Sequence, residues 1–425
     1  MGHTGAVRIA LVHYTYLPTI AGVEWVMAAH ARLFVQAGRT VTIVADRAAV
    51  AEPAGTQLAG TDLGVRSARA LRVQGELAGG GPGPIFAQAV EEWVAELRPI
   101  LAAHDVVMLH NVATMHFHPA LTAALWRLAE ELPKVRFICW VHDLAARNPD
   151  YAAVPFARAP WSLLTRGHPR FEYVAVSALR QRQFTELTGQ PPDRCRTIPN
   201  GMNPATLLDL SPRLSELADR HGLFERDLVL LQPARLLRRK NVELTLRVIA
   251  ALREAGHSCA ALITAPPEVQ SSTASEYERE VRALHAGLGL ADEVFFLSDH
   301  GPLDAREMRA LFQIADALFF PSRQEGFGIP LLEAALHRLP VFCSEIEPLT
   351  RLLPGGVSAF ALDATPEMVA KLIRCTLAAD PAYIARRTTV KNFSWTAIYR
   401  NFLSPLLTET EPNTRHEYLR ARSHP

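Results

Sequence analysis

Short, uninterrupted apolar runs that alternate with helical patterns restrict the fold of this sequence more than any other feature. Apart from Arg8, residues 7–12 form such a run, which is typical of a parallel strand covered on both faces. A loop over 15–22, a helical pattern over 23–37 ended by Gly38, and a second strand over 40–45 follow it. This strand–helix–strand unit predicts a right-handed crossover within a parallel sheet.

The same alternation continues through the first 200 residues. Further strands are predicted at 106–109, 135–141, 173–176 and 196–198, and helices at 86–97, 119–132 and 179–187. Together these elements predict one doubly wound α/β domain that covers residues 1–203.

Turn-forming residues then interrupt the pattern at Pro191-Pro192 and over 199–204, and the alternation starts again after a short helix over 214–221. Strands are predicted at 228–231, 260–264, 294–297, 317–320 and 341–343, and helices at 241–255, 275–288, 305–314 and 329–337. We therefore predict an α/β protein with two doubly wound Rossmann-like domains, the second over 204–393. The polar tail after Thr408 is expected to be frayed or lightly docked.

Length and composition agree with this division and exclude several classes of protein. A chain of 425 residues with 49% apolar residues can bury two cores. Its 44 Lys and Arg balance 43 Asp and Glu, which argues against a nucleic-acid partner. The five cysteines contain no CxxC pair, which favours buried free thiols over disulfides or zinc. Without a signal peptide or an 18-residue apolar window, we expect a soluble, cytoplasmic protein with no membrane span.

Three histidines directly follow predicted strands of the first domain: His13, His110 and His142. Open parallel sheets bind ligands beyond the carboxyl ends of their strands. Each histidine alone could be a polar strand-end cap, but three in one domain favour a shared crevice, and His142 is the strongest candidate. A metal triad is disfavoured because the spacing is unlike that of a zinc site.

Two loops could hold phosphate groups. Gly22, in Ile20-Ala21-Gly22-Val23-Glu24, opens a helix whose free N–H groups suit a phosphate, although an ordinary tight turn explains it equally well. The segment is not a GxGxxG dinucleotide fingerprint. In the second domain, Arg235 and Lys240 flank a strand-to-helix loop and together suit a diphosphate. Arg238 and Arg239 between them are expected at the surface.

The most specific segment is Phe319-Phe320-Pro321-Ser322-Arg323-Gln324-Glu325-Gly326-Phe327-Gly328-Ile329-Pro330-Leu331-Leu332-Glu333-Ala334. A strand ends near Phe320, and Pro330 is expected at the first position of a helix. Glu325 then lies in the loop and Glu333 on the first helical turn, on either side of the N–H groups of residues 327–329. Such a site suits a polyhydroxylated ligand. The alternative is two solvated glutamates around a glycine turn.

With these motifs the sequence resembles the retaining, GT-B-fold glycosyltransferases of the large group 1 family. The resemblance rests on Ala21-Gly22-Val23-Glu24, on Val141-His142-Asp143, on Ile198-Pro199-Asn200-Gly201, on Arg235 with Lys240, and on the E-x7-E signature from Glu325 to Glu333. It implies two domains that face a central cleft, with a C-terminal helix over about 394–425 that crosses back to the first domain.

The resemblance also implies roles for individual residues. Gly22 would approach the donor phosphates and His142 the donor sugar, while Arg235 and Lys240 would hold the diphosphate and stabilise the leaving group. Glu325, with Gly326, Phe327, Gly328 and Ile329 beside it, would bind sugar hydroxyls, and Glu333 would bind the ribose. His142, Arg235, Lys240 and Glu325 are the expected catalytic residues. No metal site is expected, and the chain has no D-x-D triplet.

The expected activity is transfer of a hexosyl group from a nucleoside diphosphate sugar to an acceptor hydroxyl, with retention and without cofactor or metal. The acceptor is expected to be a soluble carbohydrate or another small hydroxyl compound. A non-catalytic nucleotide-sugar-binding protein and a sugar-nucleotide epimerase on the same fold are the alternatives. The segment 145–170, with Tyr151, Phe156 and Trp161, could stack on a sugar or pack into the core.

Overall fold

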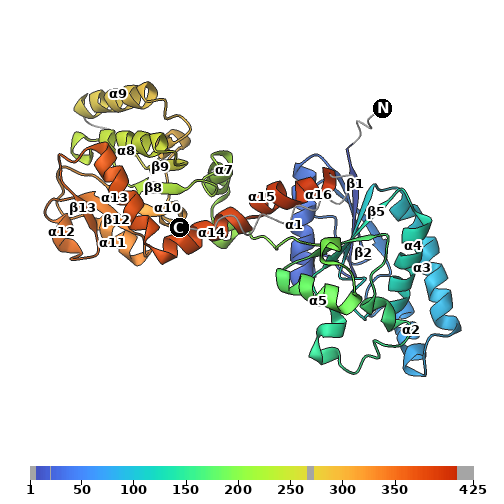
Figure 1. Ribbon diagram of the computed structural model, residues 1–425. Helices are drawn as coiled ribbons and strands as arrows, with labels where there is room; N and C mark the ends of the chain where they lie inside the picture. The colour runs from blue at the N-terminus through green and yellow to red at the C-terminus, as the bar shows by residue number, and fades with distance from the viewer. Residues whose placement is uncertain (1–5, 20, 266–271, 409–425) are drawn as a thin grey trace. The chain divides into compact units, whose positions relative to one another are not determined.

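The computed structural model describes residues 6–19, 21–265 and 272–408, which form two compact units (Figure 1). The first unit holds the described residues up to Gly201 together with those from Trp395 onward, and the second holds Met202–Ser394. Residues 1–5, Ile20 and the predicted tail after Thr408 lie outside the described residues, as does the part of the predicted C-terminal helix beyond Thr408.

The first unit contains a seven-stranded, fully parallel sheet in the order β3-β2-β1-β4-β5-β6-β7. Its strands are β1 Arg8–Val12, β2 Thr40–Asp46, β3 Thr56–Thr61, β4 Val106–His110, β5 Arg136–Val141, β6 Phe171–Ala175 and β7 Cys195–Thr197. Its helices are α1 Gly22–Gln36, α2 Ala68–Ala78, α3 Pro84–Ala102, α4 Pro119–Glu131, α5 Ala178–Thr188, α15 Trp395–Ile398 and α16 Ser404–Thr408, with 3-10 turns η1 Ala145–Arg147, η2 Pro149–Tyr151, η3 Trp161–Thr165 and η4 Pro192–Arg194 and the π-helical segment η7 Tyr399–Leu403. The order reverses between β1 and β4, where such sheets bind ligands.

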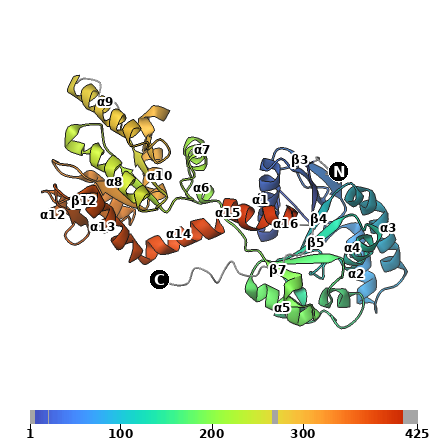
Figure 2. The same cartoon turned by 45° about the horizontal axis from the view of Figure 1, so that its top comes forward.

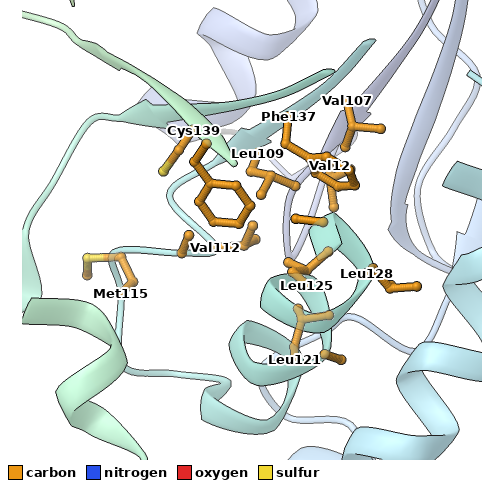
Figure 3. Close-up of a cluster of buried hydrophobic side chains, with 14 of the residues drawn as sticks. Val12, Val107, Leu109, Val112, Met115, Leu121, Leu125, Leu128, Phe137 and Cys139 are labelled. Atoms are coloured by element: carbon orange, nitrogen blue, oxygen red, sulfur yellow. The ribbon is translucent and has the colours of Figure 1, made fainter. Parts of the chain in front are cut away.

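Helices cover both faces of this sheet because successive strand side chains point to opposite faces. On one face, α2, α3, α4 and α5 pack on Val12, Leu109 and Phe137, and Figure 3 shows the part of this core that lies between α4 and the strands. On the other face, α1, α15 and α16 pack over Ile9 and Trp140. Both ribbon views show α1 beside α15 and α16 (Figures 1 and 2).

The C-terminal residues 395–408 therefore complete the core of the first unit. Ile398, Leu403, Leu406 and Leu407 are buried in the same cluster as α1. The guanidinium of Arg136 on β5 donates a 3.1 Å hydrogen bond to the backbone carbonyl of Leu406.

The second unit repeats the doubly wound plan with a six-stranded, fully parallel sheet in the order β10-β9-β8-β11-β12-β13. Its strands are β8 Leu228–Gln232, β9 Cys259–Ile263, β10 Val294–Phe296, β11 Ala317–Phe320, β12 Val341–Ser344 and β13 Ser358–Phe360. Its helices are α6 Pro204–Leu207, α7 Pro212–Arg220, α8 Val242–Glu254, α9 Ser272–Gly287, α10 Ala305–Ile314, α11 Ile329–Leu336, α12 Leu349–Leu352, α13 Pro366–Ala378 and α14 Pro381–Phe393, with 3-10 turns η5 Arg238–Lys240 and η6 Leu297–His300. The order reverses between β8 and β11, so the loops after these two strands meet at the ligand-binding edge.

Both units are thus Rossmann-like, which confirms the predicted fold class. The central cleft that the resemblance implies stays a prediction. The expectation of buried thiols is correct for four cysteines and wrong for Cys375, which is exposed, and all five are free.

Candidate functional site

In the second unit, the two motifs that the sequence singled out lie on neighbouring loops. Arg235 and Lys240 belong to the loop between β8 and α8, and Glu325 belongs to the loop between β11 and α11. The strands β8 and β11 pair directly, and the backbone N–H of Arg323 donates to the carbonyl of Arg239 at 2.7 Å. The fold therefore brings the predicted cations and the predicted carboxylate to one edge of one sheet.

Lys240 and Glu325 form an ion pair at the centre of this edge. The Lys240 ammonium bonds to Oε1 of Glu325, and these side chains are only 13% and 8% exposed. The ammonium also lies 4.9 Å from the centroid of the Phe320 ring. Arg239, expected at the surface, places Nη1 3.4 Å from Oε2 of Glu325. The carboxylate charge is thus balanced by cations of the same chain.

A buried amide, which the sequence analysis did not identify, holds the Lys240 backbone in place. Gln232, the last residue of β8, donates from Nε2 to the carbonyl of Lys240 at 2.9 Å. Its own Oε1 accepts from the hydroxyl of Thr245 on α8 at 2.7 Å. The sequence did contain a signal for this contact: a glutamine ends an otherwise apolar strand, and a buried amide requires hydrogen-bond partners.

Arg235 differs from the other cations of this loop. Its side chain is exposed, and among the described residues it has no hydrogen-bond or ion-pair partner. Arg238, by contrast, pairs with Glu280 at 2.6 Å and lies 5.3 Å from the centroid of the Tyr277 ring. Arg235 is therefore the guanidinium of this loop that is available to an anionic ligand.

The remaining predicted donor-binding residues surround the start of α11. Glu333 is exposed, and no hydrogen bond or ion pair joins its side chain to another described residue. Within the described chain, no backbone hydrogen bond uses the N–H groups of Phe327, Gly328 or Ile329. Two placements differ slightly from the prediction: α11 begins at Ile329, so Pro330 is its second residue and Glu333 lies just beyond its first turn.

Gly328 caps this helix in a conformation that other residues rarely adopt. Its φ is +107°, and a Cβ atom there would lie 2.7 Å from Cδ2 of Leu349. Replacing Gly328 by alanine is therefore expected to lower the free energy of unfolding by about 2 kcal/mol, as measured by urea denaturation. The matched control is Gly326→Ala, where a Cβ would meet no atom within 4 Å, so its stability should stay close to that of the wild type. Equal stability of both variants would contradict this account.

In the first unit, the three strand-end histidines lie together. The predicted shared crevice is correct for His13 and His142, which line one cavity, whereas His110 is fully buried and does not line it. Nδ1 of His13 donates to the backbone carbonyl of His110 at 2.7 Å, since a carbonyl only accepts. Nδ1 of His110 lies 3.1 Å from Nε2 of His142. Burial lowers the pKa of His13 and of His110 and brings that of His142 to about 3, so the three rings are neutral at pH 7.

The hydrogen bonds of these rings indicate which nitrogen of His142 carries its proton. Nε2 of His110 is buried and has no partner among the described residues. A buried N–H without a partner costs more than a free lone pair, so we assign the proton of His110 to Nδ1, which donates to His142. Neutral His142 then carries its N–H on Nδ1.

Asn111, a residue that the sequence analysis missed, fixes the backbone beside His142. Its Oδ1 accepts from the N–H groups of His142 and Asp143, both at 3.0 Å. Its own φ is +60°, a conformation that asparagine tolerates better than most residues. The signal was an Asn directly after β4, one of the two strands at the switch point of the sheet.

The buried histidines make the stability of the protein sensitive to acid. His30, packed against Trp140 and Trp395, also has its pKa lowered to about 3 by burial. Between pH 6.5 and 3 the unfolded chain binds protons that the folded rings of His30 and His142 exclude. The free energy of unfolding should therefore fall as the pH falls, by about 1 kcal/mol per pH unit for each of the two.

Urea denaturation between pH 7 and 5 measures this slope. The variant His30→Phe should show a shallower decline than the wild type, whereas His257→Phe, a partly exposed position, should not. Identical declines in the wild type and in His30→Phe would contradict the assignment.

A cavity of about 590 Å³ opens beside these histidines at the switch point of the first sheet. It is lined by residues that follow β1, β4 and β5, including His13 and His142, and by Gly22 at the start of α1. Gly22 is exposed, with open space around the position of a Cβ atom. In the segment 145–170, Tyr151, Phe156 and Trp161 all pack against the core of the first unit, and Tyr151 also lines the cavity.

Within residues 6–19, 21–265 and 272–408, no three His, Cys, Asp or Glu side chains are arranged to hold a metal ion. None of the helices in these ranges combines the length and apolar character that crossing a bilayer requires.

Comparison with known proteins matches both units of the chain. The family described as "Glycosyl transferases group 1" matches residues 215–392, and "Glycosyltransferase Family 4" matches residues 20–206. Mannosylglucosylglycerate synthase of Thermotoga maritima is 23% identical over 386 residues, which cover 84% of each chain. A D-inositol 3-phosphate glycosyltransferase of Geodermatophilus obscurus is 30% identical over 232 residues, 52% of this chain and 49% of that protein. Among solved structures, Anabaena HepE in complex with UDP and glucose is 17% identical and covers 95% of this chain and 100% of its own, with a TM-score of 0.36.

Proposed function

This chain belongs to the group 1 glycosyltransferases, and on that premise we propose that it transfers a hexosyl group from a nucleoside diphosphate sugar to an acceptor hydroxyl, with retention of anomeric configuration and without a metal ion. The proposal rests on the residues of the two loops that follow β8 and β11 at one edge of the sheet. There, an unpaired arginine, a buried lysine–glutamate pair and free backbone N–H groups lie on adjoining loops.

Each part of this edge suits one part of the donor. Arg235, exposed and unpaired, would bind the diphosphate with its guanidinium fork, and Lys240 would add a second positive charge. The free N–H groups at the start of α11, with Glu325, would bind sugar hydroxyls, and the exposed Glu333 would bind the two hydroxyls of the ribose. Neutral His142, as an N–H donor, would contact a hydroxyl oxygen of the donor sugar.

In the proposed reaction, the bond between the anomeric carbon and the diphosphate oxygen breaks, and a bond to the acceptor oxygen forms. The acceptor hydroxyl gives its proton to the departing diphosphate oxygen, and the nucleoside diphosphate leaves. Arg235 and Lys240 would stabilise the negative charge that develops on the leaving group. Two protein cations can supply the charge compensation that a metal ion gives in other enzymes, and this supports the proposal of metal independence. The sugar would pass directly to an acceptor that binding holds in position, without a covalent intermediate between the sugar and the protein.

The test is a set of UDP-, GDP- and ADP-hexoses incubated with candidate acceptors, with and without EDTA. One donor should raise the melting temperature and release its nucleoside diphosphate in the presence of an acceptor, equally well in EDTA. The NMR coupling constant of the product should report the same anomer as the donor. An inverted product, or activity lost in EDTA and restored by Mg²⁺ or Mn²⁺, would overturn the corresponding part of the proposal. Donor conversion that needs no acceptor would indicate an epimerase.

A further inference from the structure

Gln232 is the polar residue of the otherwise apolar strand β8, and it lies on the face of the sheet that α8 covers. Leu228 and Leu230 of the same strand share a core cluster with Leu246 of α8, and alternation along the strand places Gln232 on their side. Gln232 is 1% exposed, and its partner Thr245 on α8 is fully buried. Because a buried amide is costly unless its bonds are made, an apolar residue would be the ordinary occupant of this position.

The amide holds the end of the turn η5. Lys240 is the last residue of this turn, and among the described residues no backbone hydrogen bond uses its carbonyl. The bond from Nε2 of Gln232 satisfies that carbonyl. The next residue, Asn241, has a φ of +53°, and α8 begins directly after it. Gln232 therefore fixes the backbone at the point from which the ammonium-bearing side chain leaves it.

The same turn is also held from the neighbouring loop, but by an exposed residue. Besides the bond from its backbone N–H to the carbonyl of Arg239, Arg323 donates from Nη2 to Oδ1 of Asn241 at 3.2 Å. The side chain of Arg323 is 58% exposed, so water can replace this side-chain contact. The carbonyl of Lys240 has no such replacement beside the buried amide, and loss of Gln232 would leave it without a donor.

The ammonium of Lys240 needs accurate placement for its proposed role. It is paired with Glu325 and lies near the ring of Phe320 in a largely buried position. In an active site a displacement of about 1 Å can lower the rate roughly 100-fold, because stabilising charge must lie where charge develops. A shift of the Lys240 backbone would move the origin of the whole side chain, and the ammonium with it.

We propose that Gln232 is a positioning residue of the transferase: through the backbone carbonyl of Lys240, it keeps the ammonium directed at the leaving diphosphate. This inference rests on the proposed function, because that function gives Lys240 its role at the leaving group. The alternative is an amide that contributes only to stability and whose loss leaves the lysine in place.

Two matched variants separate these cases. Gln232→Met keeps the approximate volume of the side chain and removes its donor, whereas Thr245→Val removes the other hydrogen bond of the same amide and leaves the bond to Lys240. Both should lower the melting temperature, since each removes a buried hydrogen bond. Only Gln232→Met should lower kcat, by roughly 10- to 100-fold, whereas Thr245→Val should change it by less than about threefold. Equal losses of kcat in the two variants, or near-normal turnover in Gln232→Met, would overturn the proposal.

The background of Lys240→Met provides a second kinetic criterion. If Gln232 acts through Lys240, adding Gln232→Met should lower the melting temperature again but leave the residual kcat unchanged. A further loss of kcat would show that Gln232 acts on turnover by another route, and the proposal would be wrong. Gln232→Asn, whose amide is one methylene shorter, replaces Gln232→Met if that variant does not fold, with the same expected results.

Acetylation of lysines tests the placement of Lys240 without any turnover. The protein is treated with limiting acetic anhydride, and the extent of acetylation at each lysine is measured by peptide mass spectrometry. Lys391, which pairs with Asp227 in the same unit, is the internal reference. Relative to Lys391, acetylation of Lys240 should rise roughly 3- to 10-fold in Gln232→Met, the factor that one hydrogen bond supplies, and should stay at the wild-type value in Thr245→Val.

An unchanged acetylation ratio in Gln232→Met would contradict the positioning role even if kcat fell. Failure of the proposed function would appear separately, as no nucleoside diphosphate released from any donor by the wild type. The acetylation ratio would then still decide whether Gln232 holds Lys240 in place.

Discussion

Replacing Arg235 by alanine is expected to lower kcat by roughly 100- to 1000-fold, the usual loss when one group that stabilises transition-state charge is removed. The side chain is exposed and has no partner within the described structure, so the fold should not depend on it. The melting temperature should therefore stay unchanged while turnover, followed as release of nucleoside diphosphate, falls.

The matched control is Arg238→Ala, which removes the same charge three residues along the same loop. Arg238 is already engaged by Glu280, and its loss should change turnover by less than about threefold, as for a surface ion pair. Arg235→Lys should recover part of the activity, because an ammonium replaces the charge but not the bidentate geometry. Near-normal turnover in Arg235→Ala would remove Arg235 from the proposed mechanism.

The second large effect is expected at the buried pair of Lys240 and Glu325. Lys240→Met leaves the Glu325 carboxylate with only the more exposed Arg239 as partner, and should lower the free energy of unfolding by about 3 kcal/mol. Glu325→Gln should have a similar cost because it leaves the ammonium without its counter-charge. Each variant should also lose turnover by roughly 100-fold or more.

The double variant Lys240→Met with Glu325→Gln distinguishes the contribution of the ion pair to stability from its contribution to turnover. Because neither charge then remains, most of the lost stability should return, as shown by urea denaturation. Turnover should stay as low as in the single variants. A double variant that regained both stability and activity would show that the pair supports only the fold, and additive losses of stability would show that the two side chains do not interact.

Much of the fold could be predicted because buried parallel strands are short apolar runs. The strands β1, β8 and β11 were placed to within a residue or two for this reason. The strands β3 and β13 were missed, since β3 is only partly buried at the edge of its sheet and β13 has three residues. Helices α13 and α14 were missed although Thr365 and Asp380, each followed by proline, carry the signals of a helix start.

In the candidate site, too, some features could be predicted from the local sequence and others could not. That Arg235, Glu325 and His142 lie at sheet edges follows from their positions after strands. That Gln232 holds the Lys240 backbone, or that His110 bonds to His142, depends on distances between segments far apart in the chain, which one sequence does not contain. The positive φ of Asn111 likewise has a local signal, but its two hydrogen bonds do not.

The return of the chain to the first unit has a consequence for biosynthesis. Residues 395–408 cover the sheet face that carries Trp140 and adjoin α1, yet they are made only after the whole second unit. At ribosomal speeds of about 5–20 residues per second, this apolar face stays uncovered for roughly 10 to 40 s, while the second unit is synthesised. During that interval the nascent first unit exposes an apolar surface that is prone to aggregation, and ribosomes that stop before Trp395 release a chain whose first unit lacks this cover.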